Sequence, residues 1–175
     1  MAIAFRPTTV DHLLALEEIR LLVLSYSYCV DGGDGDLVGL FTEDGVWDSS
    51  DNGHPKLVGR EELTRFFGDA ATRQSRRQEQ DEAGRTRLHH MVLSPLVTDL
   101  TDDEAHGIST YTGQVIFSGR SYTVLEAGRY HDHYVRTPDG WRFRARVLEH
   151  MLPSRSLENK LLTSEESLGR RYEAS

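Results

Sequence analysis

The sequence predicts an α+β domain in which helices come first and an antiparallel sheet follows. Between Thr8 and Val30, apolar residues recur at three- and four-residue spacing, which indicates a long amphipathic helix. The second half is instead rich in Val, Ile, Thr, Tyr and Phe and is divided by short turn segments. Helices followed by hairpin-connected strands are typical of α+β folds, and such a sheet can curl around the helices.

Length and composition limit the classes of protein that this chain can be. Its 175 residues suit one domain that is large enough to bury a core and a pocket. The formal net charge is −8 and the arginines are scattered among acidic residues, so we expect no nucleic-acid partner. No apolar run approaches a membrane span and the N-terminus is too weakly apolar for a signal peptide. We therefore expect a cytoplasmic protein that binds no membrane.

The helical half is expected to begin with a cap at Thr8 and Asp11. The long helix should end near Gly32–Gly35, because glycines weaken a helix, and Cys29 is expected in its core-facing side. The next expected elements are a short helical piece at 36–41, a turn at 42–45, a short strand around 46–48 and a helix at 59–67. The polar segment at 73–87 is interpreted as a solvated helix end and loop, with a basic protein-binding patch as the alternative.

The remaining chain is expected to form strands and a tail. Strands are predicted near 86–100, 104–118, 121–136 and 141–150, with turns at 101–103, 118–119 and 138–140. We expect one domain over 1–150 and a partly helical tail over 151–175, which would act as a lid or as an arm onto another subunit.

Several polar residues are candidates for chemistry, each with a plain alternative. Asp31 lies at the end of the long helix, where a negative charge is disfavoured by the helix dipole, so it is either a turn residue or a site residue with a partner. His131 and His133, with His106, have a spacing that could hold a metal, but histidines on an outer sheet face are common and we expect no metal site. Alternation places Arg142, Arg144 and Arg146 on one face of the last strand.

Six short motifs, in order, resemble the SnoaL-like domain of the NTF2-like superfamily over about residues 8–150. They are YSYCVD at 26–31, DLVGLFTEDG at 36–45, GREEL at 59–63, HMVLSP at 90–95, GRYHDHY at 128–134 and DGWRF at 139–143. The resemblance implies a cone, in which a curved antiparallel sheet wraps around the long N-terminal helix and encloses a largely apolar pocket. It is greatest to the branch that contains scytalone dehydratase, a hexachlorocyclohexane dehydrochlorinase and bile acid 7α-dehydratase.

The resemblance also implies a set of site residues. The catalytic Asp and His of that branch match Asp31 and His90, and a Tyr five residues before the Asp matches Tyr26. An Arg in the last strand, which matches Arg146, lines the site of the dehydrochlorinase. We expect substrate contacts from Arg146 and, in addition, from Trp47 and Ser94. Alternation along the strand does not decide between His89 and His90, and the spacing to Pro95 favours His90.

Two departures from the branch leave the reaction open. The dehydratases carry a second Tyr on the first strand, but this sequence has none around 47–50. Ser94 stands where an Asn commonly follows the His by four residues. Two of the proposed catalytic residues also have a structural alternative. Tyr26 would then be an aromatic residue of the core, and His90 a hydrogen-bonded histidine of the core.

An aspartate bound to one ring nitrogen of a histidine fixes its tautomer and makes the other nitrogen a base near neutral pH. We therefore expect a cofactor-independent acid–base lyase or isomerase, such as a dehydratase or cyclase, that acts on a hydrophobic cyclic polyketide, steroid or terpenoid. The alternatives are a non-catalytic binding or assembly domain, or the small subunit of a ring-hydroxylating dioxygenase. The resemblance implies a homodimer or homotrimer.

Overall fold

The computed structural model describes residues 4–82, 87–117 and 121–151. Its elements are α1 (Val10–Val30), the 3-10 turn η1 (Val38–Leu40), β1 (Phe41–Asp48), the 3-10 turn η2 (Ser50–Asn52), β2 (Lys56–Val58), α2 (Gly59–Phe67), α3 (Ala70–Glu82), β3 (Arg87–Val92), β4 (Leu96–Leu100), β5 (Glu104–Phe117), β6 (Ser121–Thr137) and β7 (Gly140–His150). The predicted α+β class is confirmed. The predicted tail lies outside the described residues, except for Met151.

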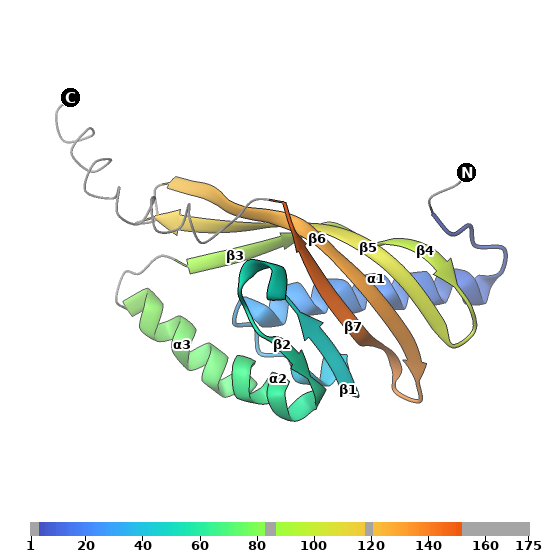
Figure 1. The fold of residues 1–175 in the computed structure, drawn as a ribbon, viewed down its shortest axis with the longest axis horizontal. Helices are drawn as coiled ribbons and strands as arrows, with labels where there is room; N and C mark the ends of the chain where they lie inside the picture. Colours follow the sequence, from blue (N-terminus) through green and yellow to red (C-terminus); the bar gives the residue numbers. More distant parts are fainter. Residues whose placement is uncertain (1–3, 83–86, 118–120, 152–175) are drawn as a thin grey trace.

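One curved sheet contains all seven strands, in the order β2-β1-β7-β6-β5-β3, and β4 pairs with β5 beside β3. The long strands β5, β6 and β7 curve across the molecule, and α1 lies along one face of them (Figure 1). The sheet is mixed rather than purely antiparallel, because β1 runs parallel to β7. A parallel pair needs a long crossover, and the described chain between β1 and β7 includes both later helices and five strands.

Helix α1 begins one residue later than the predicted cap. The Oγ1 atom of Thr9 accepts the backbone N–H of His12 at 3.1 Å, so Thr9 and not Thr8 satisfies the first turn. The helix ends at Val30, as the following glycines predicted, and Asp31 is its C-cap. Its buried face consists of Ala15, Ile19, Leu22, Val23, Tyr26 and Cys29, which confirms the core position of the cysteine.

Two predicted boundaries differ in the structure. The expected turn at 42–45 lies inside β1, where the pairing with β7 shifts between Phe41 and Val46. A Cβ atom at Gly45 would lie only 2.8 Å from the Cβ of Phe41, so this irregular stretch requires a glycine. The single segment predicted at 86–100 is two strands, β3 and β4, separated by 93–95, where Pro95 has no N–H to donate to a ladder.

The segment predicted as a solvated helix end contains a buried arginine. Arg73, on α3, is 7% exposed and donates to the carbonyl oxygens of Cys29 at 3.2 Å, Gly68 at 2.7 Å and Gly35 at 2.6 Å. A planar guanidinium can serve several carbonyls at once, and the C-terminus of a helix attracts a cation. Arg73 therefore binds the backbone at the C-terminal end of α1 and in the turn that follows it, next to Asp31.

No helix in the described part of the chain is both long enough and apolar enough to cross a membrane.

Candidate active site

The last turn of α1 holds the backbone of β3. Ser27 and Asp31 lie four residues apart, on one row of the helix. The Ser27 hydroxyl donates to the carbonyl oxygen of His90 at 3.0 Å, and Asp31 Oδ2 accepts the backbone N–H of His90 at 2.8 Å. Because β3 is an outer strand of the sheet, these side chains satisfy backbone groups that no further strand binds. These two contacts therefore hold the backbone of His90 in place independently of its ring.

The ring of His90 is bound by the same carboxylate. Its Nδ1 atom lies 2.6 Å from Asp31 Oδ1, and the two side chains are 16% and 11% exposed. A carboxylate acceptor places the ring proton on Nδ1 and leaves Nε2 to accept or release a proton. The structure thus joins the two residues of the predicted pair. These contacts also compensate the charge of Asp31 at the helix C-terminus.

Asp31 also contacts His89, which strand alternation in the sequence could not distinguish from His90 as the inward-facing residue. The Nδ1 atom of His89 lies 2.7 Å from Asp31 Oδ2, but the side chain of His89 is 61% exposed. His90 instead faces the interior, with the ring of Tyr111 at a centroid distance of 6.5 Å. Of the two, His90 has the geometry for a substrate enclosed by the sheet.

Tyr26 and Trp47 meet in the interior, one turn of α1 before the pair. The indole N–H of Trp47 donates to the Tyr26 hydroxyl oxygen at 2.9 Å, and both side chains are buried. Burial raises the pKa of Tyr26 to about 12. The hydroxyl therefore stays protonated at physiological pH, with its own O–H left to donate.

Arg146 lies inside the cone but is paired with an acid. Its Nε and Nη2 atoms donate to the two carboxylate oxygens of Asp132, each at 2.8 Å, and Tyr134 donates to the same carboxylate at 2.9 Å. The guanidinium lies 4.1 to 4.2 Å from the ring centroids of Tyr26, Tyr130 and Phe143. Its Nη1 atom is buried and has no hydrogen-bond partner among the described residues. This nitrogen is therefore a buried donor whose hydrogen-bonding capacity no described residue uses.

The predicted common face of the three arginines is wrong. The pairing of β7 with β6 skips Arg144, so the inward positions change from Trp141 and Phe143 to Arg146 and Leu148. This bulge leaves Arg144 outside, where it pairs with Asp44 at 2.6 Å. The alternation of inward and outward side chains is interrupted at a bulge. The sequence alone does not show where this bulge lies.

The other predicted residues lie away from the pair. Ser94 is exposed in the loop between β3 and β4. The rings of His106 and His133 stack with centroids 4.5 Å apart, and His131 pairs with Glu149 at 2.8 Å. Within the described ranges, no three His, Cys, Asp or Glu side chains are grouped so that they could hold a metal ion.

Three interior polar residues were missed by the sequence reasoning: Tyr111, Glu126 and Asp132. Asp132 alternates with Tyr130 and Tyr134 on β6, and this spacing was the available signal for an inward acid. Glu126 and Tyr111 had no such signal, because their importance depends on which strands lie side by side.

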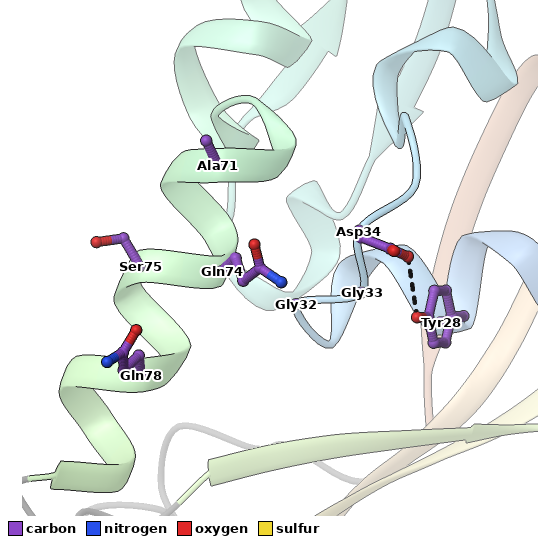
Figure 2. Close-up of a pocket in the computed structure, with 8 residues that line it drawn as sticks. All are labelled: Tyr28, Gly32, Gly33, Asp34, Ala71, Gln74, Ser75 and Gln78. Atoms are coloured by element: carbon purple, nitrogen blue, oxygen red, sulfur yellow. Dashed lines mark hydrogen bonds between the residues drawn. The ribbon is translucent and has the colours of Figure 1, made fainter.

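A separate polar groove of about 550 Å³ lies between the end of α1 and α3. Figure 2 shows Gln74 pointing from α3 toward Gly32 and Gly33, and the hydroxyl of Tyr28 bound to Asp34. Neither Asp31 nor His90 lines this groove, although Gly32 follows Asp31 directly. The candidate pair therefore does not belong to the lining of this groove.

Interior tyrosines should make the free energy of unfolding depend on pH in the alkaline range. The pKa of Tyr26 is raised to about 12 by burial, whereas an ordinary tyrosine titrates near 10. The unfolded chain therefore loses this proton first, so the stabilisation is complete below about pH 10 and is lost as the pH rises toward 12. Urea unfolding at several pH values should show this decline in wild type and a shallower decline in Tyr26→Phe. Equal declines would contradict the assignment.

Known proteins that are similar to this chain share its fold. The SnoaL-like domain family matches residues 11–147. A search of curated proteins gave no match. The solved structures that are similar include an "ntf2-like protein with a cystatin-like fold" from Novosphingobium aromaticivorans, with 24% identity, a TM-score of 0.63 and coverage of 85% of this chain and 91% of that one.

Two further structures from the same organism are similar. One is titled "Putative Scytalone Dehydratase" (19% identity, TM-score 0.62, coverage 82% and 89%). The other is the "beta subunit of a putative aromatic-ring-hydroxylating dioxygenase" (16% identity, TM-score 0.58, coverage 80% and 91%). At these identities the likeness concerns the fold alone. The family match spans most of the chain, including the residues that build the candidate site. This chain belongs to the SnoaL-like domain family.

Proposed function

We propose that this protein is an acid–base lyase or isomerase that acts on a hydrophobic cyclic substrate, such as a polyketide, steroid or terpenoid. The observation that supports it most is the contact of 2.6 Å between Asp31 Oδ1 and His90 Nδ1. His90 would remove a proton from carbon with its Nε2 atom, and Asp31 would hold the ring and stabilise the imidazolium. No step of this chemistry requires a cofactor from the protein.

The surroundings of the pair fit such a substrate. The interior carries the aromatic rings of Tyr26, Tyr111 and Tyr130, which offer apolar area to a cyclic molecule. The O–H of Tyr26 and the unpaired Nη1 of Arg146 are donors suited to a carbonyl or hydroxyl oxygen of the substrate. Trp47 would act through Tyr26, whose oxygen it binds. Ser94 stays a prediction, as do assembly into a homodimer or homotrimer and a cytoplasmic location.

The alternatives predict different behaviour. A binding or assembly domain, or a small oxygenase subunit, has no need for a partly buried carboxylate that fixes a histidine ring. We expect wild type to turn over at least one of two probes: 3-hydroxy-1-tetralone, which loses water to give 1-naphthol, and 5-androstene-3,17-dione, which isomerises to the conjugated enone. Asp31→Asn should be about 10²- to 10³-fold slower, because an amide can hold the wrong tautomer. Activity in neither probe, or an unaffected Asp31→Asn variant, would overturn the proposal.

A further inference from the structure

A second carboxylate faces the other nitrogen of His90. The Nε2 atom of His90 lies 3.6 Å from Glu126 Oε1, and the Glu126 side chain is 12% exposed. His90 thus has one carboxylate at each ring nitrogen, Asp31 at Nδ1 and Glu126 at Nε2. The other groups around it are His89, bound to Asp31, and the ring of Tyr111.

The sheet produces this contact through a glycine. His90 on β3 is opposite Gly113 on β5, and Gly113 is opposite Glu126 on β6, so the three residues form one row across three strands. A Cβ atom at Gly113 would lie 2.4 Å from Glu126 Cγ. Only the missing side chain lets the glutamate lie over the middle strand and reach toward His90. The ladder also shifts register directly after Gly113.

Among the described residues of the site, the interior tyrosine hydroxyls are poor acids for a leaving group. The Tyr111 hydroxyl is buried without a hydrogen-bond partner in the described ranges. Burial, and after it the charge of Glu126, raises the pKa of Tyr111 well above its usual value. The Tyr111 hydroxyl can therefore orient an oxygen atom but is a poor acid. The same holds for Tyr26, whose pKa is raised by burial to about 12.

We propose that Glu126 is a catalytic residue that shares one proton with His90 and acts as the acid when His90 acts as the base. This proposal rests on the function proposed above. In the reactive state, His90 carries a proton on Nδ1 only and Glu126 is protonated. His90 Nε2 takes the proton from a carbon beside a carbonyl group, and the C–H electron pair forms the new C=C bond. The C–O bond at the adjacent carbon breaks, and the oxygen leaves as water with the proton of Glu126.

The cycle then closes without another reactant. After water has formed, His90 is an imidazolium and Glu126 a carboxylate. Transfer of the Nε2 proton to Glu126 restores the starting state. The two atoms are 3.6 Å apart before substrate binds, and such contacts shorten in the substrate complex. For an isomerisation, the same acid would return a proton to a second carbon.

The first test is a titration that needs no substrate. The ¹⁵N signals of the His90 ring report its protonation in wild type, Glu126→Gln and Glu149→Gln. If the two side chains share one proton, removal of the Glu126 carboxylate, whose Oε1 lies 3.6 Å from Nε2, should shift this midpoint from that of wild type. Glu149 is about half exposed and pairs with His131, so its variant is a matched control that should leave the midpoint unchanged. An unchanged midpoint in Glu126→Gln would overturn the proposal.

The second test measures the role of the acid and the role of the base separately, with two related probes. 1-Tetralone has an exchangeable C–H beside its carbonyl but no leaving group, whereas 3-hydroxy-1-tetralone must also lose its hydroxyl. Glu126→Gln should slow the dehydration about 100-fold and leave deuterium exchange into 1-tetralone within about threefold of wild type. Gly113→Ala, which displaces the glutamate, should show the same split.

Equal losses in both reactions would make Glu126 a positioning residue and would overturn its role as the acid, as would unchanged dehydration. Thermal unfolding of each variant confirms that it is folded. If wild type acts on neither tetralone, this counts against the proposed function, and the titration still decides whether Glu126 shares the His90 proton.

Discussion

Replacement of His90 by alanine should lower the turnover of an accepted probe by about 10³- to 10⁴-fold while the fold is retained. The imidazole supplies the only atom of the proposed pair that removes the substrate proton, so no neighbouring group can replace it at the same place. Its backbone contacts to Ser27 and Asp31 do not involve the ring and remain in the variant. Steady-state rates and a circular dichroism spectrum test both parts of this expectation.

His89→Ala is the matched control for this variant. His89 is the preceding residue and binds the same aspartate, but its side chain is 61% exposed and lies on the other side of the strand. We expect its turnover to stay within about threefold of wild type, because its contact with Asp31 is solvent-screened. A larger loss in His89→Ala than in His90→Ala would show that the assignment of the two histidines is reversed.

Asp132→Asn should be the most destabilising of the conservative changes in the interior. It leaves the fully buried charge of Arg146 without its carboxylate, and breaking such a pair costs about 3–5 kcal/mol. Burial alone would lower the pKa of Arg146, and in wild type the charge of Asp132 raises it above its usual value. A guanidinium is not deprotonated in proteins, so the variant keeps a buried charge that has lost its counter-ion. Urea unfolding measures the loss as a change in the free energy of unfolding.

Two further variants serve as controls for the loss of stability expected in Asp132→Asn. Asp44→Asn removes a similar contact to Arg144 on the surface and should cost less than about 1 kcal/mol. The double variant Asp132→Leu with Arg146→Met removes both charges and should be more stable than Asp132→Asn alone. If Asp132→Asn costs no more than the surface variant, the buried pair does not stabilise the fold.

Much of the architecture could be predicted from the sequence, because it depends on local patterns. The apolar spacing of α1, the glycines that end it and the turn residues between the later strands specify their own neighbourhood. The parallel pairing of β1 with β7 could not be predicted in this way, since it joins segments about 100 residues apart. The split between β3 and β4 was missed although Pro95 marked it.

The candidate site was predictable only in part. The ordered motifs pointed to Asp31 and His90, which the structure brings within 2.6 Å. The pairing of Arg146 with Asp132 was hidden by a bulge, and the approach of Glu126 by a glycine on an intervening strand. The burial of Arg73 was hidden by its polar surroundings, because its three carbonyl partners lie on backbone that no side-chain pattern reveals.

A double-mutant cycle of Asp31→Asn and His90→Ala, measured as turnover of 3-hydroxy-1-tetralone, tests the proposed acid–base pair most directly. If Asp31 acts through the His90 ring, the aspartate change has nothing left to impair once the ring is gone. The double variant should then be about as slow as His90→Ala alone. Losses that multiply would show that the two residues act independently and would contradict the pair.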